Sequence, residues 1–229
     1  MRWRWPGAAA AGLVLFAAGL ALQPMPVPRD VPLPHLLPDG PLRITVFGTS
    51  LTAPPQTWPD DLAARLEFCR KAPVTITRVA GPGMGSAWAL DQVGRMAATA
   101  PDLALIEFAI NDADLRDGVS LATARAQHRA LIADLRAALP DAQFALMTMN
   151  PAHGPRGWIR PRLAAHYAQY HDLALTEGMG LIDLYPRWLA RARGARGLDS
   201  DGLHPDPAVA AGIIVGAAAG YHDPGRKCL

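Results

Sequence analysis

The stretch Arg43-Ile-Thr-Val-Phe-Gly-Thr-Ser-Leu-Thr52 decides how this sequence is interpreted. A short apolar run, typical of a buried strand, leads there into a Gly-Thr-Ser turn. Open α/β sheets place their sites at the carboxyl ends of the strands, and Ser50 would lie at this edge. A serine hydroxyl is a weak nucleophile unless a base lies within hydrogen-bond reach. Asp201 and His204, three residues apart near the end of the chain, supply a candidate base and a group to orient it.

The rest of residues 41–229 alternates between short β-rich runs and longer helical ones. Strands are predicted at 42–47, 74–79, 103–108, 143–149 and 179–184, and helices at 58–71, 87–98, 121–139, 162–176, around residue 188 and at 207–221. Single helices between strands imply parallel pairing with right-handed crossovers. The pattern therefore predicts one domain, a three-layer α/β/α sandwich with a five-stranded parallel sheet of flavodoxin-like type. Polar residues alternating in the second strand place it at an outer position.

The first 22 residues are expected to lie outside this domain. Arg2 and Arg4 precede an uninterrupted run of small and apolar residues at 8–22. Fifteen such residues are short for a membrane span and typical of a signal peptide, and a retained N-terminal anchor is the alternative. Both interpretations predict export, to the periplasm or to the outer face of the cytoplasmic membrane. With the anchor, residues 8–22 would tether the protein to the membrane.

Residues 23–40 are rich in proline, which predicts an extended, semi-rigid linker. The net charge of +2 comes from Arg2 and Arg4 alone, since the remaining basic and acidic residues balance at 20 each. A neutral body argues against nucleic acid as a partner. The chain has two cysteines, Cys69 and Cys228, which in an exported protein could form one disulfide or remain two free thiols. Their spacing to the histidines is not that of a metal site.

Four loops that follow predicted strands carry glycine or polar residues. They contain Gly48-Thr49-Ser50, the segment 80–86 with Gly81 and Gly83, the segment Ala109-Ile-Asn-Asp112, and the segment Asp201-Gly-Leu-His204. Loops after parallel strands emerge at one edge of the sheet, so we expect these four to converge. Acyl transfer requires a nucleophile, a base, a group that orients the base, and donors for an oxyanion. These loops could supply all four.

These four blocks resemble those of the SGNH (GDSL-like) hydrolase family. Gly48-Thr-Ser-Leu51 is similar to Gly-Asp-Ser-Leu with Thr for Asp, and Ala109-Ile-Asn-Asp112 to Gly-x-Asn-Asp with Ala for Gly. The last block matches Asp-x-x-His. The resemblance covers residues 41 to about 221. It implies Ser50, Asp201 and His204 as a catalytic triad, with Gly83 (or Gly81) and Asn111 in the oxyanion hole, and no cofactor.

The sequence thus predicts an exported serine esterase that acts on short-chain or acetyl esters, in a small molecule, a glycan or a lipid of the cell envelope. Acyl transfer to a sugar hydroxyl by the same triad is one alternative. A catalytically silent glycan-binding domain is another. Each block also has a structural interpretation, because glycine, asparagine and serine favour turns and helix caps. His153, Trp58 and Trp88 could contact substrate, although an exposed loop for the histidine and core packing for the tryptophans are the simpler interpretations.

Overall fold

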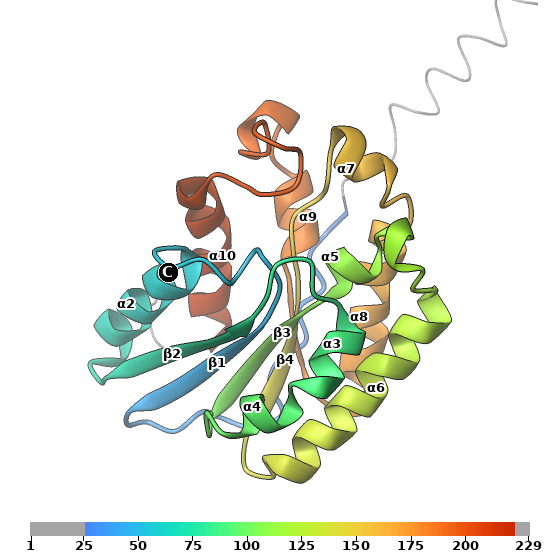
Figure 1. The fold of residues 1–229 in the computed structure, drawn as a ribbon. Helices are drawn as coiled ribbons and strands as arrows, with labels where there is room; N and C mark the ends of the chain where they lie inside the picture. Colours follow the sequence, from blue (N-terminus) through green and yellow to red (C-terminus); the bar gives the residue numbers. More distant parts are fainter. Residues whose placement is uncertain (1–25, 223–229) are drawn as a thin grey trace, which may run out of the picture.

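In the computed structural model, which describes residues 26–222, five strands form one parallel sheet in the order β2-β1-β3-β4-β5 (Figure 1). The strands are β1 (Leu42–Gly48), β2 (Val74–Ala80), β3 (Leu103–Glu107), β4 (Gln143–Thr148) and β5 (Gly180–Asp183). Helices cover both faces of the sheet. The predicted α/β/α sandwich with five parallel strands is confirmed.

Two layers of helices enclose the sheet (Figure 1). One layer contains α2 (Trp58–Arg70) and α10 (Pro207–His222), and the other contains α3 (Ser86–Asp91), α4 (Val93–Ala97), α6 (Leu121–Ala138) and α8 (Leu163–Glu177). Shorter helices follow β3, β4 and β5: α5 (Ala109–Asp112), α7 (Gly154–Trp158) and α9 (Leu184–Leu189). Within residues 26–222, no helix combines the length and the apolar character needed to cross a bilayer.

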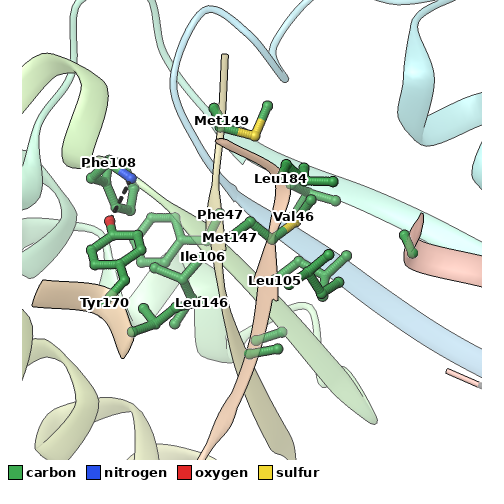
Figure 2. Packing of buried hydrophobic residues seen from close by; sticks show 14 of the residues in the cluster. Val46, Phe47, Leu105, Ile106, Phe108, Leu146, Met147, Met149, Tyr170 and Leu184 are labelled. Atoms are coloured by element: carbon green, nitrogen blue, oxygen red, sulfur yellow. Dashed lines mark hydrogen bonds between the residues drawn. The ribbon is translucent and has the colours of Figure 1, made fainter. Parts of the chain in front are cut away.

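Burial along the strands follows from their places in the sheet. Every residue of β3, β4 and β5 is buried, as expected for strands covered by helices on both faces. By contrast, β2 has exposed residues at Thr75 and Thr77 between buried or half-buried neighbours, and it lies at the edge of the sheet, as its polar residues predicted. Aliphatic side chains of neighbouring strands form the core around Phe47 and Phe108, whose rings pack edge to face with centroids 5.0 Å apart (Figure 2).

The observed helices differ from the predicted ones in places. The helix predicted at 87–98 is two short helices, because Gln92 leaves the helical conformation with φ −102° and ψ 5°. The four-residue α5 and the five-residue α7 were not predicted. Each is too short to show the periodicity by which a helix is recognised in a sequence.

Part of the proline-rich segment packs on the domain. Val31 forms an antiparallel bridge with Leu181 of β5, with N–H···O distances of 3.0 and 2.8 Å in the two directions. The carboxylate of Asp30 pairs with Arg187 of α9 at 2.6 Å and accepts a hydrogen bond from the backbone N–H of Asp183. Residues 29–31 are therefore held against β5 and α9, and the backbone N–H of His35 donates to Gln143 of β4 at 3.0 Å, so this segment does not stand clear of the domain as a spacer would.

Two predictions concern residues beyond the described part of the chain. The signal peptide or anchor at residues 1–22 lies outside it. Cys69 is not a free thiol, but Cys228 also lies outside the described residues. The Cys69–Cys228 disulfide therefore stays a prediction.

Candidate active site

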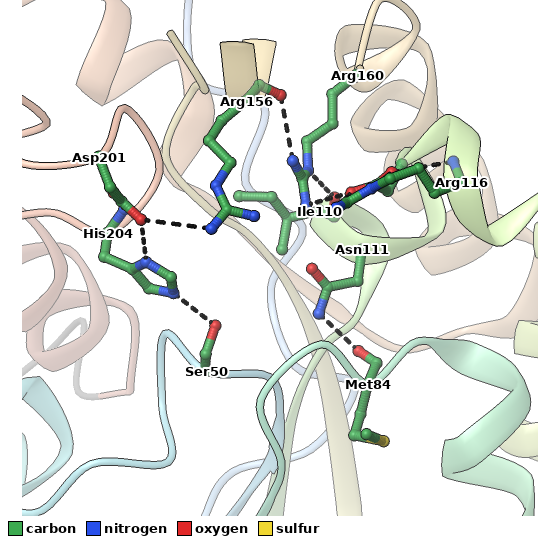
Figure 3. A network of polar contacts seen from close by, with 10 residues as sticks. Ser50, Met84, Ile110, Asn111, Arg116, Arg156, Arg160, Asp201 and His204 are labelled. Atoms are coloured by element: carbon green, nitrogen blue, oxygen red, sulfur yellow. Dashed lines mark hydrogen bonds and ion pairs between the residues drawn. The ribbon is translucent and has the colours of Figure 1, made fainter. Parts of the chain in front are cut away.

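The structure brings Ser50, His204 and Asp201 into one hydrogen-bonded chain (Figure 3). Ser50 Oγ lies 2.8 Å from His204 Nε2, and His204 Nδ1 lies 2.7 Å from Asp201 Oδ2. Asp201 Oδ1 accepts hydrogen bonds from the backbone N–H groups of His204 and Leu203 at 2.8 and 2.9 Å. The partial burial of Asp201 would raise its pKa, but these hydrogen bonds and the His204 ring outweigh it and lower the pKa to about 2. Asp201 is thus an anion that holds the imidazole in place.

The loop that carries Asp201 and His204 is fastened to the segment after β4. Gly202 has φ +79°, and a Cβ there would lie 2.4 Å from the carbonyl oxygen of His153, so only glycine fits. The backbone N–H of His153 donates to the Gly202 carbonyl at 2.7 Å, and Asn150 Nδ2 donates to the Leu203 carbonyl at 2.7 Å. These contacts fix the distance from His204 to the end of the sheet.

A buried carboxylate holds the turn that carries Ser50. Glu107, at the end of β3, is 1% exposed and lies beside Gly48 in the sheet register. It accepts hydrogen bonds from the backbone N–H of Thr49 at 2.6 Å and from the hydroxyls of Thr49 and Thr52 at about 3 Å. A Cβ at residue 48 would lie 2.1 Å from Glu107 Oε1, which explains the glycine. Burial raises the pKa of Glu107 to about 7, although the hydrogen bonds act in the opposite direction.

Gly83 and Asn111 line the same pocket as Ser50 and His204. Gly83 has φ +73°, and a Cβ there would meet no atom within 4 Å, so its backbone faces open space. The N–H of Gly81, the alternative to Gly83, donates to the Gly48 carbonyl at 3.2 Å and is thus already used. The side-chain amide of Asn111 donates to the Met84 carbonyl at 2.9 Å (Figure 3).

Asn111 lies on α5, and its neighbour Asp112 ties this helix to the glycine-rich loop. Asp112 Oδ1 accepts the backbone N–H of Ser86 at 2.8 Å. A Cβ at Gly85 would approach that oxygen to 2.6 Å. Asn111 thus lines the pocket, while Asp112 connects α5 to the glycine-rich loop behind it.

Three arginines line the pocket, which has a volume of about 270 Å³. Arg116 and Arg160 each pair with Asp114, at 2.6 and 2.9 Å, and Asp117 also lies on the wall. Arg156, on α7, completes the set. Glu107 and these arginines were not predicted from the sequence to be site residues. The sequence signals were a single charge inside an apolar strand and a pair of arginines, 156 and 160, one helical turn apart after the fourth strand.

The three other candidate contacts, Trp58, Trp88 and His153, do not line the pocket that contains Ser50. Trp58 is 1% exposed, and its indole N–H donates to the Leu51 carbonyl at 3.0 Å, so it supports the Ser50 loop from the core. Trp88 packs against Phe47 with ring centroids 6.1 Å apart. His153 is partly buried, and its Nε2 lies 3.5 Å from a nitrogen of Arg196. Burial is the main cause that lowers the pKa of His153, and the nearby positive charges of Arg193 and Arg196 lower it further. Over residues 26–222, no group of histidine, cysteine and acidic side chains is arranged to hold a metal ion.

Comparison with known proteins gives a family match. Residues 44–211 match the model of the GDSL-like Lipase/Acylhydrolase family. Among curated protein sequences, none matches the chain.

Solved structures share the fold at low sequence identity. A lipase/acylhydrolase from Enterococcus faecalis is 22% identical with a TM-score of 0.66, over 76% of this chain and 93% of that one. A catalytic mutant of Axe2, an acetylxylan esterase from Geobacillus stearothermophilus, is 17% identical with a TM-score of 0.66, over 79% and 94%. The psychrotrophic esterase EstA from Pseudoalteromonas sp. is 20% identical with a TM-score of 0.58, over 77% and 93%.

Proposed function

This chain belongs to the GDSL-like lipase/acylhydrolase family and is a serine ester hydrolase, and on that premise we propose that it hydrolyses short-chain acyl esters with Ser50 as nucleophile. The observation that carries the proposal is the hydrogen-bonded chain from Ser50 through His204 to Asp201, with heavy-atom distances of 2.8 and 2.7 Å. Both distances are those required for proton transfer from a nucleophile to a base.

The geometry supports a two-step reaction. His204 Nε2 accepts the proton of the Ser50 hydroxyl as Oγ attacks the ester carbonyl, and Asp201 stabilises the resulting imidazolium. When the tetrahedral intermediate collapses, His204 returns the proton to the leaving alcohol, and an acyl-serine remains. Water, activated by the same histidine, then attacks the acyl carbonyl and releases the carboxylic acid and free Ser50.

The tetrahedral intermediate also needs hydrogen-bond donors for its oxyanion. We assign this role to the backbone N–H groups of Ser50 and Gly83 and to the Asn111 side chain. An amide nitrogen carries two hydrogens, so Asn111 can keep its bond to Met84 and offer the second hydrogen to the oxyanion. Removing one such donor typically costs about 3 kcal/mol of transition-state stabilisation.

Two observations favour a short acyl group. The pocket that contains Ser50 is lined largely by polar and charged side chains, and a long acyl chain would need an apolar groove. One protein of the same fold is an acetylxylan esterase, which makes an acetylated glycan a suitable substrate class to test. Export to the cell envelope, predicted from residues 1–22, would place the enzyme beside such material.

Hydrolysis of p-nitrophenyl acetate, butyrate and octanoate tests the proposal. We expect activity to decrease with chain length, and Ser50→Ala to lower kcat by at least about 10³-fold, since the triad then has no nucleophile. Ser120→Ala is a matched control, because Ser120 caps α6 away from the pocket. A folded protein in which Ser50→Ala hydrolyses the esters as fast as wild type would contradict the assignment.

A further inference from the structure

Arginine is concentrated near the catalytic edge of a domain whose basic and acidic residues balance overall. Residues 142–171 contain three arginines and no acidic residue, and residues 184–198 contain four arginines and none. The first stretch includes α7, and the second leads into the loop of Asp201 and His204. Helix α7 and the segment that follows α9 lie toward the upper edge of the sheet in Figure 1. The local excess of positive charge therefore borders the pocket of Ser50.

Two of the three arginines that line the pocket already have a carboxylate partner. Arg116 and Arg160 share the buried carboxylate of Asp114. Arg160 also donates to the backbone carbonyls of Ile110 at 2.8 Å and Arg156 at 3.1 Å. These two guanidinium groups thus have structural partners that account for their burial or their position.

Arg156 is different. Its guanidinium projects into the pocket between Asp201 and Asn111, across from Ser50 (Figure 3). Within the described part of the chain, the one carboxylate near it is that of Asp201, at 4.0 Å, which is too long for a hydrogen bond. The Asp201 carboxylate does not depend on Arg156 for hydrogen bonding, since both its oxygens already accept shorter hydrogen bonds. The side chain is 38% exposed, so its donors are accessible to a ligand.

We propose that Arg156 binds a carboxylate carried by the alcohol part of the ester, so that the preferred substrates are acyl esters of acidic alcohols such as acetylated uronic acids. This inference rests on the proposed function and names the substrate class of the same site. The planar guanidinium fork matches a carboxylate in two parallel hydrogen bonds. Arg156 lies 4.0 Å from Asp201, beside His204, which protonates the leaving alcohol in the proposed reaction, whereas Asn111 and Gly83 are assigned to the acyl oxygen. The anion therefore belongs to the alcohol side.

A pair of substrates that differ in one substituent, a carboxylate or a neutral amide, tests this inference. For the full-length protein, kcat/KM is measured with 4-acetoxybenzoate and with its neutral analogue 4-acetoxybenzamide. We expect the benzoate-to-benzamide ratio to fall about tenfold in Arg156→Gln, and Arg156→Lys to restore part of it, because lysine keeps the charge without the fork. Arg95→Gln, which removes an exposed charge on α4 near the opposite end of the sheet, should leave the ratio unchanged.

Binding of the non-hydrolysable 4-acetamidobenzoate and 4-acetamidobenzamide, followed by calorimetry, separates this inference from the proposed function. Tighter binding of the benzoate that is lost in Arg156→Gln supports the carboxylate site even if no ester is hydrolysed, in which case the proposed function fails alone. Ester hydrolysis that depends on Ser50, with a substrate ratio unaffected by Arg156→Gln, overturns the inference and leaves the proposed function intact. Equal binding of the two amides to wild type and Arg156→Gln also overturns it.

Discussion

Glu107 shows how one buried side chain organises the site from behind. Its carboxylate accepts hydrogen bonds from the Thr49 backbone and from two threonine hydroxyls, and so fixes the turn on which Ser50 stands. No described cation pairs with it, and burial raises its pKa to about 7. The protonated form is therefore favoured in the folded state at a pH where an exposed glutamate is ionised.

This pKa predicts a pH-dependent contribution to stability. The folded protein holds the Glu107 proton more tightly than the unfolded chain does, so the free energy of unfolding falls as pH rises from about 4.5 to 7 and is level above. We expect the wild-type protein to lose about 3 kcal/mol relative to Glu107→Gln between pH 4 and pH 8. Urea unfolding of both proteins at each pH measures the difference. Asp134→Asn, which changes an exposed position on α6, is the control and should show no comparable trend with pH. A difference in the free energy of unfolding between wild type and Glu107→Gln that is the same at pH 4 and pH 8 would contradict the raised pKa of Glu107.

At the residue scale, functional residues that belong to a spaced motif can be predicted from the sequence. Residues whose role depends on their surroundings in the folded structure cannot. Ser50, Asp201 and His204 could be predicted because their chemistry requires those residue types, and because Ser50 follows the first strand while the other two precede the last helix. Glu107 and Arg156 belong to no such pattern. Their importance comes from burial in one case and from a missing partner in the other, and both depend on which side chains the fold places nearby.

At the element scale, α5 is positioned by a buried relay that starts on α8 (Figure 2). The Tyr170 hydroxyl accepts hydrogen bonds from the backbone N–H groups of Phe108 and Ala109 at 2.9 and 3.0 Å. It donates to His128 Nε2 at 2.8 Å, because His128 Nδ1 donates to the Ala124 carbonyl and Nε2 is left to accept. Burial lowers the pKa of His128 despite the nearby Asp112 carboxylate, so the ring is neutral.

Tyr170→Phe should therefore destabilise the protein and disturb the helix that carries Asn111. Two buried backbone N–H groups and a ring nitrogen lose their partner, which we expect to cost about 2–5 kcal/mol in the free energy of unfolding. Chemical denaturation measures the loss. Tyr185→Phe, which removes a hydroxyl from a partly buried tyrosine on α9, is the matched control. Equal stability of the two variants would show that the relay does not hold α5.

The strands and long helices could be predicted within a few residues because apolar periodicity and buried runs identify them. The helix predicted at 87–98 could not be placed correctly, since the break at Gln92 depends on how α3 and α4 each pack against α6. Likewise α5 and α7 are single turns set by tertiary hydrogen bonds. Asn111 and Arg156 lie on these two short helices, and Ser50, Asp201 and His204 lie in loops. The tertiary contacts that fix these loops and short helices leave no periodic pattern in the sequence, so they could not be predicted.

At the scale of the whole molecule, residues 26–40 extend the domain beyond the boundary at residue 41. The bridge between Val31 and Leu181 covers the open edge of β5, and Tyr221 of α10 donates to the Val31 carbonyl at 2.5 Å. Gly180 makes room for this contact, since a Cβ there would lie 2.0 Å from the Tyr221 hydroxyl. Proline content indicated an extended conformation, but only the fold shows that β5 is its docking partner.

A version of the chain that begins at residue 41 should be less stable than one that begins at residue 26. The shorter version loses the Val31–Leu181 bridge, the Asp30–Arg187 ion pair and the packing of three apolar side chains, Val31, Leu33 and Leu37, on the core. It also avoids the conformational entropy cost of ordering residues 26–40, which offsets part of the lost stability. We expect a net decrease of about 2 kcal/mol, seen as a lower Tm. Asp30→Asn in the longer version should cost under about 1 kcal/mol, as for an exposed ion pair. Identical melting curves for the two versions would mean that the segment adds nothing to the fold.

Covalent labelling of the nucleophile tests the central claim most directly. The protein is incubated with diethyl p-nitrophenyl phosphate, and the modified residue is located by mass spectrometry of its peptides. The Ser50–His204–Asp201 chain predicts a single diethylphosphoryl adduct on Ser50, formed at least about 10²-fold more slowly in His204→Ala because the serine then has no base. An adduct on another residue, or labelling of Ser50 at an unchanged rate in His204→Ala, would contradict the account.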